Sequence, residues 1–198
     1  FAVDVKVRGE HVYVAESKGG LSIWKRERDG VLRAVGRFRV RGQSIKQVVV
    51  PTPGTYALLD VGQSSFYIVD ITDPSTPKKV FKDTRHGLLY GYQIAEKLLD
   101  SRYACCFWHV TGFYWYDLYG GDTPAYSGDN LNVRFGANNG MAVLANGKDA
   151  LVTTNRQAYV IVNRQERRTL EELPRYGIKG YKLSGKPSIY GNTLYVAD

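Results

Sequence analysis

Short apolar runs separated by turn-forming residues recur along the chain. In the stretch 56–79, the runs Tyr56–Asp60 and Phe66–Asp70 are rich in β-branched and aromatic residues, and the turn-prone segment 61–65 separates them. This pattern predicts a β-hairpin. The following segment, 72–77, contains two prolines, which cannot donate to a strand ladder, so the chain is expected to leave the sheet before the next strand begins near Lys79.

The same hairpin pattern returns about every 45 residues. When the second runs of the hairpins are aligned, the residues eight positions before them are Tyr13, Leu58, Cys105 and Leu151, and a fifth copy of the first run adds Tyr195. The spacings of this series are 45, 47, 46 and 44. Four positions before each of these lies a residue at which a tight turn would require positive φ, and it is glycine in four cases of five. These residues are Gly9, Gly54, Ser101, Gly147 and Gly191.

A period of about 45 residues with four strand-like runs predicts an all-β fold, a β-propeller built of four-stranded antiparallel blades. A helical solenoid of similar period would need apolar residues spaced by three and four, and the chain has no such run of useful length. About four and a half blades are expected, as part of a larger ring, with a compact four-bladed closure as the alternative. The expected blades are 1–42, 43–87, 88–136, 137–180 and the partial blade 181–198.

Segments of the first two repeats resemble a known family. Val3–Gly9, His11–Ala15, Gly20–Trp24 and Phe66–Pro77 are similar to the LVIVD-type propeller repeat, in which the hairpin ends in Asp followed by a Ser/Thr-Asp-Pro turn. The resemblance implies the propeller fold much more than an activity. Because many members resemble bacterial surface or secreted proteins, it also implies an extracytoplasmic location: periplasmic, cell-surface or secreted.

Composition and charge narrow the class further. Hydrophobic residues make up 43% of the chain and charged residues 23%, which fits a globular protein and neither a disordered nor a fibrous one. No apolar run approaches the length of a membrane span. The net charge is +8, but the basic residues are scattered and no nucleic-acid-binding module is recognisable, so nucleic acid is not an expected partner.

Basic residues recur where each outer strand should connect to the next inner strand. In a propeller these connections meet at one end of the channel, the usual ligand end, where a ring of cations would attract an anion. Ordinary surface charge is the alternative interpretation. The residues are Arg39, Arg41, Arg85, His86, Arg134, Lys179 and Lys182.

Two of these connections carry additional polar and aromatic residues. The stretch 85–93 combines an imidazole with phenols, the matching stretch after Arg134 contains two asparagines, and an aromatic-histidine pair stands at the mouth of a hairpin loop. We predict ligand contacts at Arg41, Arg85, Tyr92, Trp108, His109, Asn138, Asn139 and Lys182. If the protein is an enzyme, the predicted catalytic residues are His86, Tyr90 and Arg134.

Two classes of function follow. The favoured one is a binding module or scaffold that holds a glycan, with an acidic one as a possibility, or a protein partner on its loop face. The alternative is a polysaccharide lyase or glycoside hydrolase acting on a uronate-containing glycan. A glycosidase would need two carboxylates flanking one bond, whereas Glu96 and Asp100 share one face with no acid opposite.

No cofactor or metal is expected, because the chain lacks zinc spacings, phosphate-binding glycine loops, nucleophile elbows and calcium loops. Asp70 and Asp73 are expected to cap backbone amides of their own turn instead of binding a metal. The adjacent Cys105 and Cys106 lie within a predicted strand and are expected to be reduced, packed thiols. These two cysteines do not indicate whether the protein works in an oxidising or a reducing compartment.

Overall fold

A computed structural model gives the architecture of the chain. It divides the chain into two compact units, residues 1–92 and 93–198, which are described separately. All regular elements within the described residues are β-strands, and the all-β prediction is confirmed. The described residues are 1–62, 65–84, 92–98, 101–108, 112–130, 138–143, 149–154, 159–163, 170–172, 188–190 and 193–195.

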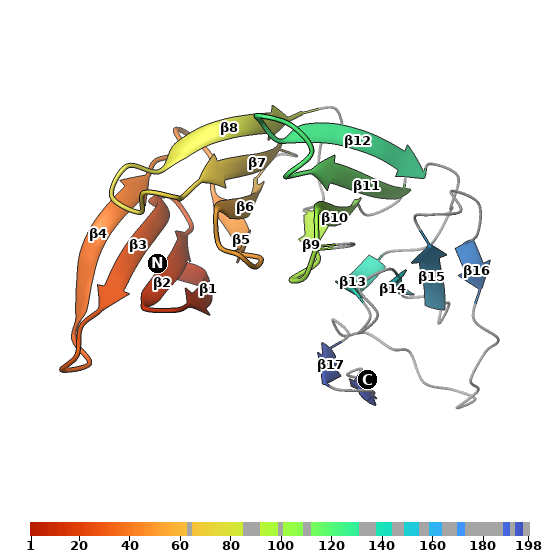
Figure 1. Cartoon of the computed structure of the whole chain (residues 1–198), viewed down its shortest axis with the longest axis horizontal. Coiled ribbons are helices and arrows are strands. Elements are labelled where there is room, and N and C mark those ends of the chain that lie inside the picture. The colour runs from red at the N-terminus through yellow and green to blue at the C-terminus, as the bar shows by residue number, and fades with distance from the viewer. Residues whose placement is uncertain are drawn as a thin grey trace. The chain divides into compact units, whose positions relative to one another are not determined.

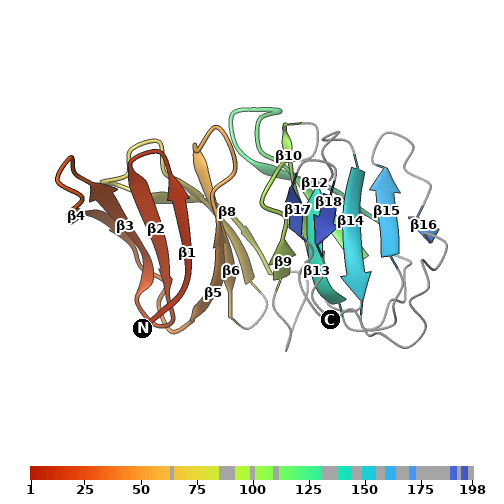
Figure 2. The ribbon, with the colours of Figure 1, turned by 90° about the horizontal axis from the view of Figure 1, so that it is seen from below.

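The first unit contains two four-stranded antiparallel sheets, each with its strands in sequence order (Figures 1 and 2). The first sheet consists of β1 (Ala2–Arg8), β2 (His11–Glu16), β3 (Gly20–Arg26) and β4 (Leu32–Phe38). The second sheet consists of β5 (Ile45–Val49), β6 (Tyr56–Val61), β7 (Ser65–Asp70) and β8 (Lys78–Asp83).

The second unit continues the same pattern. The third sheet contains β9 (Tyr92–Ile94), β10 (Tyr103–Trp108), β11 (Gly112–Asp117) and β12 (Ala125–Asn130). The fourth contains β13 (Asn138–Val143), β14 (Asp149–Thr154), β15 (Tyr159–Asn163) and β16 (Leu170–Glu172). A two-stranded sheet of β17 (Ser188–Tyr190) and β18 (Thr193–Tyr195) follows.

The strand register confirms the repeat inferred from sequence spacing. In all four central hairpins, each aligned residue pairs with the residue ten positions later: Tyr13 with Ile23, Leu58 with Ile68, Cys105 with Trp115, and Leu151 with Ile161. Since a slip of one residue would turn every side chain to the opposite face, this shared register gives each sheet the same inner and outer positions.

Two β-bulges recur with the register. One adds an extra residue to the first strand of three sheets, at Val3, Lys46 and Asn139. The other adds an extra residue to the fourth strand, at Val35, Val80 and Ser127. A bulge bends and twists its strand locally, so the repeat specifies the local twist of these sheets as well as their register.

The predicted positive φ occurs at the turn between the first and second strands. It is +58° at Gly9, +101° at Gly54 and +53° at Ser101, which is the one non-glycine residue with positive φ in the described part of the chain. Serine therefore adopts the left-handed conformation at the position where the other repeats have glycine. Gly147 and Gly191 lie outside the described residues.

The core of the first unit lies between its two sheets. The first sheet contributes alternate side chains of β2 and β3, and the second contributes the face of β5, β6 and β7 that points towards them. The turn after β7 reaches across the same interface, since a Cβ on Gly36 would lie 1.9 Å from the backbone oxygen of Pro74. The main contributors to the core are Tyr13, Ala15, Leu21, Ile23, Ile45, Val48, Ala57, Leu59, Val61 and Val69.

Local capping in the turn after β7 is as predicted. The Asp70 carboxylate accepts a hydrogen bond from the Thr72 amide at 2.8 Å, and the Asp73 carboxylate accepts one from the Ser75 amide at 2.9 Å. The hydroxyls of Ser75 and Thr76 also donate to Asp73, and these bonds lower its pKa. Both aspartates therefore have the structural role expected for this turn.

The blade boundaries, the total of four and a half blades and the larger ring stay predictions, because the two units are not placed relative to one another. The described residues contain no helix that is long and apolar enough to cross a membrane.

Candidate functional site

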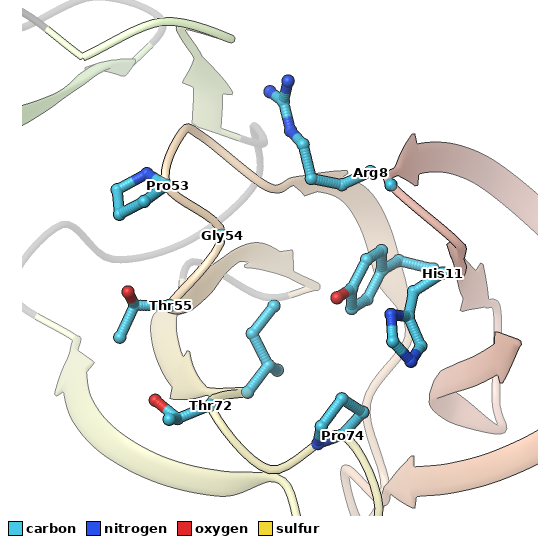
Figure 3. Close-up of a pocket in the computed structure, with 10 residues that line it drawn as sticks. Arg8, His11, Pro53, Gly54, Thr55, Thr72 and Pro74 are labelled. Carbon is cyan, nitrogen blue, oxygen red and sulfur yellow. The ribbon is translucent and has the colours of Figure 1, made fainter.

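Turns from both sheets of the first unit meet at one end of the unit. The turn after β1 (9–10), the turn after β5 (50–55) and the turn after β7 (71–77) all border the same open pocket, and we refer to this end as the pocket end (Figure 3). The pocket has a volume of about 530 Å³. We refer to it as the hairpin pocket, and its lining consists of Arg8, Gly9, His11, Tyr13, Pro53, Gly54, Thr55, Ile71, Thr72 and Pro74.

Arg8, the last residue of β1, joins the first sheet to the second at the pocket. Its Nε and Nη2 donate to the carbonyl oxygen of Val50 at 3.1 and 2.9 Å. Its aliphatic stem lies over Gly54, where a Cβ would be 3.6 Å from the Arg8 Cγ. Within the described residues Nη1 has no hydrogen-bond partner, so the fixed guanidinium keeps donors for a ligand.

Tyr13 and His11 form the aromatic wall of the pocket. Both belong to β2 and point to the same side of the strand, with ring centroids 6.3 Å apart and ring planes at 46°. Burial raises the pKa of the Tyr13 phenol, and the positive charge of Arg8 offsets part of that rise. The phenol therefore keeps its proton near neutral pH, and in the described part of the chain its hydroxyl has no hydrogen-bond partner.

The opposite wall comes from the second sheet. Thr55 lies just before β6, Thr72 just after β7, and Pro53 and Pro74 project beside them (Figure 3). The packing of Pro74 against Gly36 fixes the position of this wall relative to the first sheet. The pocket therefore presents two threonine hydroxyls, two pyrrolidine rings and the cationic and aromatic groups of the first sheet.

None of the ten lining residues is an acid. A pair of carboxylates for glycoside hydrolysis is therefore missing from this pocket. Groups of three or more His, Cys, Asp or Glu side chains that could hold a metal ion do not occur among the described residues. The arrangement suits hydrogen bonding and charge pairing with an anionic ligand better than bond cleavage.

The predicted contacts at the strand connections are only partly described. Arg41 is exposed in the connection 39–44, at the end of the first unit opposite the hairpin pocket. We refer to this opposite end as the junction end. There the Ser17 hydroxyl donates to the Ser44 hydroxyl at 3.4 Å, and the Gly62 amide donates to the Ser44 carbonyl at 2.6 Å. The hairpin pocket is thus not at the end where the sequence predicted a ligand.

The remaining predicted residues either have a described strand position or lie outside the described part of the chain. Tyr92 begins β9, Trp108 ends β10 opposite Gly112, and Asn138 begins β13, where Asn139 is the bulged residue. Cys105 and Cys106 lie in a regular stretch of the ladder between β10 and β11. The predicted residues that lie outside the described part are Arg85, His86, Tyr90, His109, Arg134 and Lys182.

The lengths of two turns could have indicated the hairpin pocket, but the charge pattern pointed to the other end of the unit. The turn 50–55 carries two prolines before Gly54 and is longer than the turn 9–10 of the first sheet. A longer turn beside a shorter one leaves room at that end of the two sheets, and Arg8 with His11 flank the short turn.

Comparison with solved structures defines the class of protein. The β-propeller domain of Cps50 (Swd1) from Myceliophteria thermophila is 15% identical with a TM-score of 0.70, and the match covers 98% of this chain and 62% of that one. A functionally unknown protein from Desulfotomaculum acetoxidans is 14% identical with a TM-score of 0.66, covering 98% and 61%. The described sheets are therefore those of a β-propeller, as predicted.

The repeat type follows from a second comparison. Residues 1–23 and 49–82 match the LVIVD repeat family, which agrees with the resemblance of the first two hairpins to that repeat. No curated protein matches the sequence.

The solved propellers are longer than this chain. A chain of the mitotic checkpoint complex is 14% identical with a TM-score of 0.59, and the match covers 80% of this chain but 46% of that one. The present chain thus spans between 46% and 62% of the length of these three structures. At such identities the likeness shows the fold alone, and a fold does not fix a function.

Proposed function

We propose that the protein is an extracytoplasmic binding module that holds an acidic saccharide in the hairpin pocket. The observation that carries the proposal is the meeting of Arg8 and Tyr13 in one open pocket, each with hydrogen-bonding capacity left over within the described residues. A uronate carboxylate would pair with the guanidinium, and the phenol would donate to a ring or hydroxyl oxygen.

The size and the lining support a small, polar ligand. The volume of about 530 Å³ lies within the range of about 300–1,000 Å³ that is usual for ligand pockets. The tyrosine and histidine rings offer an apolar edge against which a sugar ring packs, while Thr55 and Thr72 offer hydroxyls on the opposite wall. Tyr13, His11 and Arg8 come from one sheet and the threonines from the other, so a ligand would contact both.

Binding is a better proposal than catalysis at this pocket. A lyase that cleaves uronates needs a base next to the acidic carbon, and burial raises the Tyr13 pKa, which makes the phenol a hydrogen-bond donor at neutral pH. His11 is the remaining candidate base. The glycosidase alternative is disfavoured because the lining contains no acid.

The experiment compares the two ends of the first unit with a matched pair of substitutions. Arg8→Met and Arg41→Met each remove one positive charge, the first in the hairpin pocket and the second at the junction end. Titration calorimetry with a uronate trisaccharide is expected to show binding weakened about tenfold by Arg8→Met, which corresponds to about 1.4 kcal/mol, and unchanged by Arg41→Met. Tyr13→Phe should weaken it by a smaller factor, because it removes one hydrogen bond and keeps the ring.

Other results would contradict the proposal in distinct ways. If Arg41→Met weakens binding and Arg8→Met does not, the site lies at the junction end. The sequence prediction of His86, Tyr90 and Arg134 at the strand connections would then be favoured. Formation of a new ultraviolet-absorbing double bond on incubation with the trisaccharide, abolished by His11→Gln, would make the protein a lyase. Binding of a protein partner that the Arg8→Met variant retains, with no saccharide bound, would replace the glycan with a protein ligand.

A further inference from the structure

Four basic side chains lie in one row across the first sheet, at its pocket end. Arg8 of β1 pairs with His11 of β2. His11 in turn pairs with Lys25 of β3, and Lys25 pairs with Arg33 of β4. Residues directly opposite each other in an antiparallel sheet share a face, so each strand of the sheet contributes one basic side chain to the same face. We name these four residues the basic row.

The basic row lies on the face of the sheet that borders the hairpin pocket. His11 lies two positions before Tyr13 in β2, and Tyr13 points into the core between the two sheets. Lys25 likewise lies two positions after the core residue Ile23 in β3. Positions two apart in a strand share a face. Arg8 and His11 line the pocket itself (Figure 3), whereas the other two residues of the row lie beyond its lining.

The second and third sheets have different side chains at the equivalent positions. Both have a tyrosine in the second strand and an aspartate in the third, and these pairs are Tyr56 with Asp70 and Tyr103 with Asp117. Lys25 therefore occupies the position at which both of these repeats have an acid. The row of basic residues is thus a property of the first sheet and not of the repeat.

The aspartate of the other two sheets has a structural role that the first sheet does not need. In those sheets it accepts a hydrogen bond from the backbone amide two residues later. In the first sheet the equivalent amide, that of Glu27, donates instead to the Val31 carbonyl at 2.9 Å. A lysine ammonium has only donors and could not replace the carboxylate as an acceptor. The different turn therefore permits Lys25, which reverses the charge at this position without leaving that amide unpaired.

The outer half of the basic row is accessible to a ligand. The side chain of Lys25 is 41% exposed and that of Arg33 is 71% exposed. Each has one acidic neighbour, Glu10 for the lysine and Glu27 for the arginine, and both nitrogen–oxygen distances are 3.8 Å. These distances are longer than a hydrogen bond. Exposed ion pairs of this kind contribute little, so a carboxylate of a ligand can displace them.

The length of the basic row suits a chain of sugars better than a single sugar. Neighbouring strands lie about 4.8 Å apart, so the backbone positions of the row span about 14 Å. That is longer than one sugar ring, and the hairpin pocket takes up only the inner half of the row.

We propose that the basic row extends the hairpin pocket into a binding track for a linear polyuronate. One carboxylate of the chain binds Arg8 in the pocket, and further carboxylates along the same chain bind Lys25 and Arg33. The inference rests on the proposed saccharide function, and it adds that the ligand is a chain and that the chain runs from the pocket across the four strands.

Calorimetry with two oligogalacturonates of different length tests the track. Digalacturonate occupies the pocket alone, whereas hexagalacturonate reaches along the basic row. We expect the hexamer to bind at least about tenfold more tightly than the dimer, because further carboxylates engage once the first is bound. Lys25→Met and Arg33→Met should each weaken binding of the hexamer about threefold and leave binding of the dimer unchanged. Arg8→Met should weaken the binding of both.

Arg26→Met is the matched control. Arg26 follows Lys25 in β3, is exposed and lies on the opposite face, so its replacement removes the same charge away from the track. It should change the binding of neither oligomer. A loss of hexamer binding equal to that of Lys25→Met would overturn the track and indicate attraction by the net charge of the protein instead.

The remaining outcomes separate the track from the pocket. Equal affinities for the dimer and the hexamer would overturn the track and leave the saccharide pocket. A hexaglutamate peptide that binds as tightly as the hexamer, with the same dependence on Lys25, would replace the polyuronate with an acidic protein segment. If neither oligomer binds, or if Arg8→Met leaves the binding of both unchanged, the proposed saccharide function itself is wrong.

Discussion

Val5 and Val48 occupy the same position in two successive repeats, yet one is half exposed and the other is completely buried. The first and second sheets share their strand order, register and bulges. They differ in what lies on one face within the first unit. The second sheet packs with one face under the first sheet, whereas the equivalent face of the first sheet, which carries Val5, points away from the second sheet. The repeat thus specifies a surface, and a neighbour decides whether that surface becomes a core.

The largest expected difference comes from a matched pair of substitutions at this position. Val48→Ala removes two methyl groups from a fully buried site and should lower the free energy of unfolding by about 2 kcal/mol. Val5→Ala removes the same groups from an exposed site and should cost less than about 0.5 kcal/mol.

Urea unfolding of both variants measures the two losses. Equal losses would mean that the side chain of Val5 is as well packed as that of Val48, which would break the comparison.

The turns between first and second strands give a second comparison, this time across three repeats. Gly54 has a φ of +101°, outside the left-handed helical region, whereas Gly9 at +58° and Ser101 at +53° lie within it. Gly54→Ala should therefore cost about 2 kcal/mol and Gly9→Ala about 1 kcal/mol, since a Cβ at Gly9 would meet no atom within 4 Å and only the backbone is strained.

Ser101→Gly is expected to change stability in the opposite direction from Gly54→Ala and Gly9→Ala. The substitution replaces a serine in an unfavourable φ with a glycine that tolerates it, but it also makes the unfolded chain more flexible. The net effect should be a slightly higher midpoint temperature of unfolding. Thermal unfolding of the three variants gives the order. If Ser101→Gly lowers the midpoint, the serine has a local hydrogen-bonding role that outweighs its conformation.

The sequence predicted the fold well because the fold depends on local signals. Short runs of β-branched and aromatic residues predicted the strands, and the spacing of the repeats predicted the register. Each aligned residue pairs with the residue ten positions later, as seen for Tyr13, Leu58, Cys105 and Leu151. The turn residue was found even at Ser101, where the alignment and not the residue type indicated the conformation. Each of these features is determined within one repeat.

The hairpin pocket could not be predicted in the same way. Arg8 and Tyr13 lie at least 40 residues from Pro53 and Thr72 in the sequence. The four meet because two sheets pack and because the turn 50–55 is longer than the turn 9–10. Charge recurrence pointed to the junction end, where Arg41 is exposed. A pattern of like charges identifies which residues are basic, but the packing of neighbouring repeats decides which of them border a cavity.

The smallest expected effect concerns the polar pair at the end of the central hairpin, which differs in each repeat. The backbone bonds at this point are equivalent: the amides of Arg26, Ile71 and Leu118 donate to the carbonyl 16 residues earlier. The side chains beside them are Glu10 and Lys25 in the first sheet, Thr55 and Asp70 in the second, and Arg102 and Asp117 in the third.

The third-sheet pair has the better geometry. Arg102 donates to both oxygens of Asp117 at 2.8 and 2.5 Å, whereas Lys25 and Glu10 are 3.8 Å apart and the side chain of Glu10 is more exposed than that of Asp117. The hydrogen bonds from Arg102 lower the pKa of Asp117. Because the folded state favours the carboxylate, the pair contributes stability above the ordinary aspartate pKa, and the contribution is lost as the pH falls through the lowered folded pKa. It should also weaken with added salt.

A double-mutant cycle on Arg102→Ala and Asp117→Asn should therefore give a small favourable coupling at pH 7 that vanishes in strong acid. The matching cycle on Lys25→Ala and Glu10→Gln is expected to give a coupling near zero at any pH, since exposed pairs of that geometry contribute little. Denaturant unfolding at low salt measures both. A coupling for Arg102 and Asp117 that persists unchanged below the lowered pKa would contradict charge pairing as its source. The contact of the guanidinium with the ring of Tyr103, 5.1 Å from the guanidinium carbon, cancels in this cycle.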